Sequence, residues 1–238
     1  GFRLLRAFLN WAAEQPEYRG LVDPAHLLTK TVRRSVPKPR AKDDCRQREQ
    51  LPLWFDAIRQ HCTPTFSAYL QALLLTGSRA QEIASLKWED ADFQWQSLTI
   101  KDKVEGERVI PLTPYVATLL DALPRRNQWV FSSTRAPAGR ITDANAAHAK
   151  ALRTAGLPHV SIHGLRRSFG TLSEWVECPV GVVAQIQGHK PSAIAEKQYR
   201  RRPLDLLRQW HAKIEAWILT EAGIPQPQAG AGRLRRVK

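Results

Sequence analysis

The sequence predicts a mainly helical protein with one small antiparallel β-sheet, and three observations lead to this α+β class. Apolar residues recur at helical spacing along most of the chain. Two short runs with β-branched residues flank Glu105-Gly106, which is typical of a β-hairpin. The length of 238 residues, of which 43% are hydrophobic, is enough for one sizeable core and a smaller element.

The charge of the chain indicates its class of partner. Lys and Arg total 36 against 22 Asp and Glu, a net charge of +14. On a chain with a foldable composition, such a charge points first to nucleic acid and second to an anionic membrane face. No apolar run approaches the ~18 residues of a membrane span. Three cysteines that lie far apart support neither a disulfide framework nor a zinc site. We therefore expect a cytoplasmic protein.

The first segment is predicted to hold two helices. Its apolar residues have helical spacing from Phe2 to Ala12, and Asp23-Pro24 then offers an N-cap with proline at the first helical position. Two helices are too few to close a core alone. The start at Gly1, the absence of Met and the lack of a basic-then-apolar leader indicate a fragment of a longer protein.

A basic stretch follows from Lys30 to Arg48. It carries eight basic residues against Asp43 and Asp44, with prolines between them, and is predicted to be an extended linker. A solvated loop would explain its shape equally well. Its local charge favours contact with a DNA backbone.

The next segment is predicted to contain helices and then the hairpin. Helices are expected over Leu53–His61, Thr65–Leu75 and Arg79–Leu86. The second of these is expected to end at Thr76-Gly77. The hairpin strands are expected at Ser97–Lys101 and Arg108–Leu112.

Beyond Pro114 the pattern is mostly helical, with a brief apolar run at Trp129–Phe131. Pro203–Glu221 reads as an amphipathic helix. The tail from Pro225 to Lys238 is basic and predicted to be loose.

Four strings carry unusual polar chemistry. In Thr76–Ile83, Arg79 directly follows a glycine turn and Glu82 lies within its reach on the same helical face, which suits an anion cradle. In His163–Phe169, the i, i+3 spacing places His163 and Arg166 together, a proton carrier beside a phosphate clamp. Taken alone, the first string is equally compatible with an ordinary Arg–Glu helix pair, and the second is more often a helix-capping histidine.

The third string is Gln187-Gly188-His189, followed ten residues later by Tyr199 among four basic neighbours. The fourth is the hairpin turn with Lys103, where a lysine would ordinarily serve solubility. Alternatively, Tyr199 has only a structural role and packs on one face of a surface helix.

The combination and its order resemble the tyrosine recombinase family, in its phage and prophage integrase branch. The resemblance covers roughly residues 46–223. Arg79 lies in the family's TGxRxxE string, Lys103 precedes the Arg-Val-Ile-Pro-Leu run, and His163 and Arg166 form the HxLR pair. His189 belongs to the Gly-His string, and Tyr199 stands at the position of the nucleophile.

The resemblance implies a fold, an activity and a set of roles. We expect the tyrosine recombinase catalytic-domain fold and a site-specific DNA recombinase that works through a 3′-phosphotyrosyl intermediate, integrating or excising a prophage or genomic island. The catalytic residues it implies are Arg79, Lys103, His163, Arg166, His189 and Tyr199. It implies no cofactor and no metal. Glu82 is interpreted as a support that orients Arg79 or a neighbouring loop.

The resemblance also implies an organisation and partners. Residues 1–44 would be the end of a core-binding domain with its basic linker, residues 45–223 the catalytic domain, and residues 224–238 a basic flexible tail. Attachment-site DNA, a homotetramer with exchange of the C-terminal helix, and accessory DNA-bending or directionality factors would be the partners, at the bacterial nucleoid and not at a membrane.

Two departures and three alternatives remain at this point. Gln187 stands where the family mostly has Leu, and Ile194-Ala195-Glu196 stands where Thr is frequent. A silent architectural DNA-binding protein and a type IB topoisomerase-like relaxase share parts of the pattern. The carboxylates of Glu89, Asp90 and Asp92 could hold Mg²⁺ for a two-metal nuclease, but we interpret them as turn residues.

Overall fold

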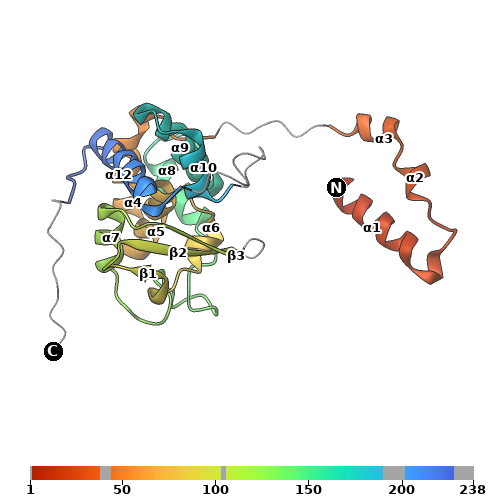
Figure 1. The fold of residues 1–238 in the computed structure, drawn as a ribbon, viewed down its shortest axis with the longest axis horizontal. Helices are drawn as coiled ribbons and strands as arrows, with labels where there is room; N and C mark the ends of the chain where they lie inside the picture. Colours follow the sequence, from red (N-terminus) through yellow and green to blue (C-terminus); the bar gives the residue numbers. More distant parts are fainter. Residues whose placement is uncertain (1, 38–43, 103–105, 190–201, 228–238) are drawn as a thin grey trace. The chain divides into compact units, whose positions relative to one another are not determined.

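The computed structural model describes residues 2–37, 44–102, 106–189 and 202–227 (Figure 1). The chain divides into two compact units, residues 1–42 and residues 43–238. The second unit is mostly helical with one three-stranded antiparallel sheet. The predicted α+β class is therefore confirmed.

The first unit consists of short helices. They are α1 (Phe2–Glu14), η1 (Pro16–Tyr18), α2 (Pro24–Leu27) and α3 (Lys30–Ser35). Asp23 starts α2 by accepting a hydrogen bond from the Ala25 main-chain N–H at 2.9 Å. Ala12 and Leu28 are the buried apolar residues in the described part of this unit, so it has little core of its own.

The prediction of an extended linker from Lys30 onward was wrong for its first part. Residues 30–35 are helical because the Thr29 side chain accepts from the Val32 N–H and caps α3. The helix ends before Pro37, where the chain cannot continue helical hydrogen bonding. Residues 38–43 lie outside the described residues, and Arg48 opens the short helix η2 (Arg48–Gln50).

Two helices form the centre of the second unit. These are α4 (Leu51–His61) and α5 (Pro64–Thr76), each with a proline in its first turn. Every residue of α5 from 67 to 76 is buried, which explains its apolar character on all sides. It ends at Gly77, which has a left-handed φ of 60° and lies so close to Phe169 that a Cβ would be 2.6 Å from its ring.

The sheet follows α6 (Ala80–Ala84) and η3 (Trp88–Asp90). Its strands β1 (Ala91–Asp92), β2 (Ser97–Asp102) and β3 (Gly106–Pro111) lie in the order β1-β2-β3. The register pairs Leu98 with Ile110 and Ile100 with Arg108. The predicted hairpin is confirmed, while β1, at two residues, is too short to produce an alternating pattern in the sequence.

The remaining helices complete the unit: α7 (Pro114–Asp121), α8 (Asn145–Thr154), α9 (Ile162–Ser173), η4 (Glu174–Val176), α10 (Val180–Gln187) and α12 (Leu204–Glu221). Helix α8 packs on α4, and α9 packs on α5. In Figure 1 the sheet and α7 lie at one side of this unit, with α8, α9 and α10 at the other.

Helix α12 packs inside its own unit. It contacts β3, α4, α5, α9 and α10, and its residues Leu207, Ile214 and Ile218 are at most 2% exposed. Its Glu215 carboxylate accepts from the Tyr115 N–H at 2.9 Å and from the Thr113 hydroxyl. Glu215 thereby caps the start of α7. The apolar face of residues 204–221 is thus part of the core of this unit.

Candidate active site

Arg79 is placed by the turn that ends α5. Gly77 allows the left-handed reversal, and Arg79 then occupies the N-cap position of α6. The Glu82 carboxylate accepts from the Arg79 main-chain N–H at 2.8 Å and from its Nη1 at 2.7 Å. The predicted pairing of Arg79 with Glu82 is therefore present, and it fixes both the main chain and the guanidinium of Arg79.

A second arginine holds the same carboxylate. Arg108 on β3 donates from Nη1 to Glu82 Oε1 at 3.0 Å and from Nη2 to Oε2 at 2.7 Å, a bidentate pair. Burial opposes ionisation of Glu82, but the hydrogen bonds from Arg108 and Arg79 outweigh it and lower the pKa of this carboxyl. Glu82 is therefore a buried carboxylate shared by two guanidinium groups.

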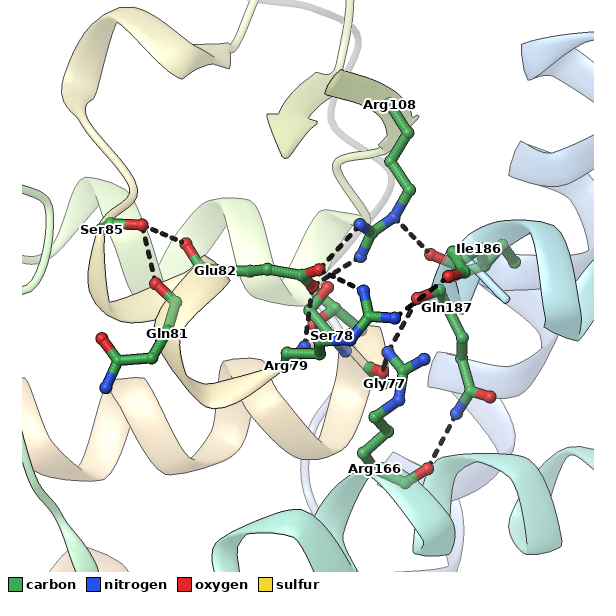
Figure 2. Close-up of polar contacts among 12 residues, drawn as sticks. Gly77, Ser78, Arg79, Gln81, Glu82, Ser85, Arg108, Arg166, Ile186 and Gln187 are labelled. Atoms are coloured by element: carbon green, nitrogen blue, oxygen red, sulfur yellow. Dashed lines mark hydrogen bonds and ion pairs between the residues drawn. The ribbon is translucent and has the colours of Figure 1, made fainter. Parts of the chain in front are cut away.

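The carboxyl end of α10 gathers three arginines (Figure 2). The Ile186 carbonyl accepts from Arg108 Nε at 3.2 Å, the Gln187 carbonyl from Arg166 Nη1 at 2.7 Å, and the Gly188 carbonyl from Arg79 Nη2 at 3.4 Å. The last carbonyls of a helix lack partners within the helix and carry partial negative charge. Three successive carbonyls thus bring guanidinium groups from α6, β3 and α9 to one place.

Helix α9 supplies His163 and Arg166. The Ser161 hydroxyl caps the helix by accepting from the Gly164 N–H at 3.0 Å. Arg166 is buried and also donates to the Gly77 carbonyl at 2.7 Å, which joins α9 to the turn before Arg79. His163, three residues earlier, is exposed at the surface beside it.

The segment before α4 fastens the start of α9. Asp44 Oδ2 accepts from the Ser161 N–H at 3.1 Å and from its hydroxyl at 2.7 Å, and Asp44 pairs with Arg167. Burial opposes ionisation of Asp44, yet these hydrogen bonds lower its pKa to about 2. The Arg46 main-chain N–H donates to the Ser168 hydroxyl at 2.7 Å. The helix that carries His163 is therefore held at its N-terminal end.

Both histidines of the site are biased toward the neutral form. Although His163 is exposed at the surface, partial desolvation by its surroundings is the main cause that lowers its pKa, followed by Arg167 and Arg166. Burial is also the main cause that lowers the pKa of His189, followed by Arg166 and Arg79. Because these arginines act on both imidazoles, the structure brings His163 and His189 to the same arginine cluster.

Gln187 has a structural explanation where the family mostly has Leu. Its Nε2 donates to the Arg166 main-chain carbonyl at 2.8 Å, and the residue is buried. Gln187 and Arg166 are therefore joined twice. The Gln187 side chain donates to the Arg166 main chain, and the Arg166 side chain donates to the Gln187 main chain.

The structure places four of the six predicted catalytic residues together: Arg79, His163, Arg166 and His189. Lys103 lies in the connection between β2 and β3, and Tyr199 lies between His189 and Arg202. Both are outside the described residues. Their roles stay predictions.

Two residues of the site were missed by the analysis of the sequence. Arg108 was noted only as part of the run that follows Lys103, although an arginine two residues before Ile110 in a hairpin strand lies on the same face as that apolar residue, which is a usable signal. Asp44 was counted only against the charge of the linker. Its partners are 117 and 123 residues away in the chain, and nothing local reveals them.

The carboxylates considered for a metal serve other purposes. Asp90 accepts from the Lys87 N–H at 3.0 Å and pairs with Lys101 at 2.6 Å. Asp92 accepts from the Gln94 and Trp95 N–H groups of the turn before β2. Within the described ranges, no group of three His, Cys, Asp or Glu side chains is placed to hold a metal ion.

The arrangement suits a tetrahedral oxyanion. Fixed guanidinium groups can neutralise charge that develops on non-bridging phosphoryl oxygens, and a neutral imidazole can accept or share a proton beside them. The described helices do not include one that is both long and apolar enough to cross a membrane.

Comparisons with known proteins give consistent matches. Residues 48–203 match the phage integrase family, and residues 1–34 match the phage integrase core-binding domain. The chain is 58% identical over 231 residues to prophage integrase IntF of Escherichia coli (strain K12), which covers 94% of this chain and 49% of that protein. The chain thus spans about half the length of this relative.

Two solved structures share the fold. An integrase from mycobacterium phage Brujita aligns with a TM-score of 0.59 and 21% identity, over 90% of this chain and 69% of that one. A lambda integrase tetramer bound to a Holliday junction aligns with a TM-score of 0.60 and 16% identity, over 84% of this chain and 60% of that one.

Proposed function

The chain belongs to the phage integrase family, and from that premise we propose that it supplies the strand-cleaving and rejoining part of a site-specific DNA recombinase. The target would be the junctions between a prophage or genomic island and its host chromosome. The single observation that carries this proposal is the set of arginines fixed by the last carbonyls of α10, next to two histidines.

The first step is attack by Tyr199. Its phenol oxygen forms a bond to the scissile phosphorus, and the bond from phosphorus to the 5′ oxygen breaks. The products are a 3′-phosphotyrosyl enzyme and a 5′-hydroxyl. Because the phosphodiester energy is kept in the covalent intermediate, rejoining by the reverse attack needs no ATP.

Arg79 and Arg166 neutralise the charge on the non-bridging oxygens in this step. They are held before substrate arrives, because main-chain carbonyls and Glu82 fix their guanidinium groups. Loss of one such preorganised donor typically costs ~10²–10³ in rate.

Protons move through the neighbouring side chains. Lys103 gives a proton to the departing 5′ oxygen, since an ammonium on a hairpin connection can reach into the DNA. His163 accepts the phenol proton of Tyr199 or holds it in position. His189 donates a hydrogen bond to a phosphoryl oxygen, for which its neutral form is sufficient.

We assign residues 1–44 to the end of a core-binding domain with its linker, residues 45–223 to the catalytic domain, and residues 224–238 to a basic tail. The matches to residues 1–34 and 48–203 support this division, as does the boundary between the two compact units after residue 42. In a homotetramer on attachment-site DNA, exchange of the C-terminal helix would give a neighbouring protomer the contacts that residues 204–221 make here within their own unit.

The test is a search for covalent protein–DNA adducts. Supercoiled plasmid that carries the element junctions is incubated with the wild-type chain and with Tyr199→Phe, and SDS-resistant adducts are separated on a denaturing gel. Adduct at one position, lost in Tyr199→Phe, is the expected result. Adduct at many positions would favour a topoisomerase-like relaxase, and DNA binding without adduct in either protein would favour an architectural role.

A further inference from the structure

Arg108 is the less exposed of the two arginines that hold Glu82. Its side chain is 17% exposed, against 39% for Arg79 and 5% for Glu82. Glu82 therefore lies between a guanidinium that is turned toward solvent and one that is turned inward. A substrate phosphate that reaches Arg79 would not need to touch Arg108.

Arg108 joins three elements at once. It sits on β3, forms the bidentate pair with Glu82 of α6, and donates to the Ile186 carbonyl of α10. Its guanidinium also lies against the backbone of Gly188, where a Cβ would be 2.8 Å from Cζ, so a larger residue at 188 would displace this guanidinium. Figure 2 shows Arg108 reaching from its strand over Glu82 to the end of α10.

The charges of these three side chains make Arg108 necessary for more than packing. Arg79, Arg108 and Glu82 together carry a net charge of +1. Without Arg108, Glu82 and Arg79 would form a neutral pair, and the buried carboxylate would have Arg79 as its sole guanidinium partner in this trio. The attraction of Arg79 for a phosphate would then be reduced at contact and largely cancelled at distances greater than the separation of the pair.

We propose that Arg108 is a positioning residue that offsets the charge of Glu82, so that Arg79 keeps its positive charge available for the scissile phosphate. This inference rests on the proposed function for its biological meaning. The physical claim, that Arg108 sets the anion affinity of Arg79, stands on the geometry alone.

The experiment compares four variants of the full chain: Arg108→Gln, Arg108→Lys, Glu82→Gln and the double variant Glu82→Gln/Arg108→Gln. The first readout is the binding of inorganic phosphate, followed through the ¹⁵N-labelled side-chain signal of Arg79. The second is the rate of adduct formation on the junction DNA. Thermal unfolding selects the variants that remain folded.

The double variant separates the charge role from a structural one. Arg108→Gln is expected to slow cleavage by about 10²-fold, the lower end of the rate loss typical of a preorganised charge contact, and to weaken phosphate binding. The double variant removes the carboxylate as well and restores the net charge of +1. It should therefore cleave at least about tenfold faster than Arg108→Gln and bind phosphate more tightly than Arg108→Gln does. Arg108→Lys keeps the charge without the fork and should fall between Arg108→Gln and wild type.

Three results would overturn the inference. A double variant no better than Arg108→Gln would mean that Arg108 only holds the structure together. Arg108→Gln with unchanged phosphate binding and unchanged cleavage would remove any role. The same loss in Arg59→Gln, which removes a guanidinium that donates to Tyr115 away from this cluster, would show a general effect of net charge.

Failure of the proposed function would look different. A wild-type chain that forms no adduct refutes the recombinase proposal, while the phosphate titration still decides the role of Arg108. A wild-type chain that forms adduct as fast as Arg108→Gln refutes the role of Arg108 and leaves the recombinase proposal intact.

Discussion

Gly164 and Gly170 lie in the same helix and should respond to the same substitution in opposite directions. Both belong to α9, the helix of His163 and Arg166. A Cβ at Gly164 would lie 2.5 Å from the Asp44 carbonyl oxygen and 2.5 Å from Val160 Cγ1. A Cβ at Gly170 would meet only the end of the Gln187 side chain, at 3.9 Å.

The magnitudes follow from these distances. Replacing a helical glycine by alanine stabilises a helix by about 1 kcal/mol when nothing obstructs the methyl group, which is the expectation for Gly170→Ala. At Gly164 the Asp44 backbone has to move by about 1 Å to reach normal contact, which weakens its hydrogen bonds to Ser161. Overpacking and lost hydrogen bonds together cost about 2–4 kcal/mol. Gly164→Ala should therefore be destabilised by about 1–3 kcal/mol net.

The assay is urea unfolding of wild type, Gly164→Ala and Gly170→Ala at pH 7.5, with the free energy of unfolding obtained from each transition. Gly170→Ala is the matched control because the residue change and the helix are the same. If Gly164→Ala proved as stable as Gly170→Ala, Asp44 would not be packed on α9 as described, and the reasoning about how this helix is held would be refuted.

Three other predictions concern titratable groups. Since the pKa values of His163 and His189 are lowered, both imidazoles should stay neutral at pH 7. The cleavage rate should therefore fall only when the pH drops below 6.5. A rate that has already halved above pH 6.5 would contradict this. Burial lowers the pKa values of His148 and His211 from 6.5 to about 4, so the unfolded chain binds protons in this range that the folded chain does not. Stability is then fully present above pH 6.5 and lost as the pH falls toward 4, and equal urea midpoints at pH 7 and pH 4.5 would refute it. Glu215→Ala leaves the buried N–H donors at the start of α7 without an acceptor and should cost about 2–4 kcal/mol of unfolding free energy. Glu215→Gln keeps one acceptor oxygen and should cost about half as much. Equal losses in the two variants would count against the role of Glu215 as a cap.

Local patterns were sufficient for most of the fold. The helices α4, α5 and α12 follow from apolar periodicity and from the proline and glycine signals at their ends, and the hairpin follows from its β-branched runs. Helix α3 was missed because charge and proline content dominated the interpretation of that stretch. The sequence does contain a signal for this helix, because Thr29 is a favourable N-cap residue three positions before Val32.

The site was predictable only where its residues form short motifs. Arg79, His163, Arg166 and His189 were found because each motif has a fixed local spacing. Arg108 and Glu82 are 26 residues apart, and their pairing depends on how the sheet packs beside α6. The acceptors on α10 are main-chain carbonyls, which have no residue type and so leave no trace in a sequence.

That the arginines are held by main-chain atoms of α10 changes which kinds of mutation the site can tolerate. Exchanging the Ile186 side chain would leave its carbonyl in place, so side-chain substitutions there test packing and not the anchoring of Arg108. A one-residue deletion within α10 would rotate everything after it by about 100° and shift it by about 1.5 Å along the axis. Anchors for Arg79, Arg108 and Arg166 would be displaced in a single event. Among natural variants of this protein, the length of α10 should therefore stay constant, even where its exposed positions are substituted.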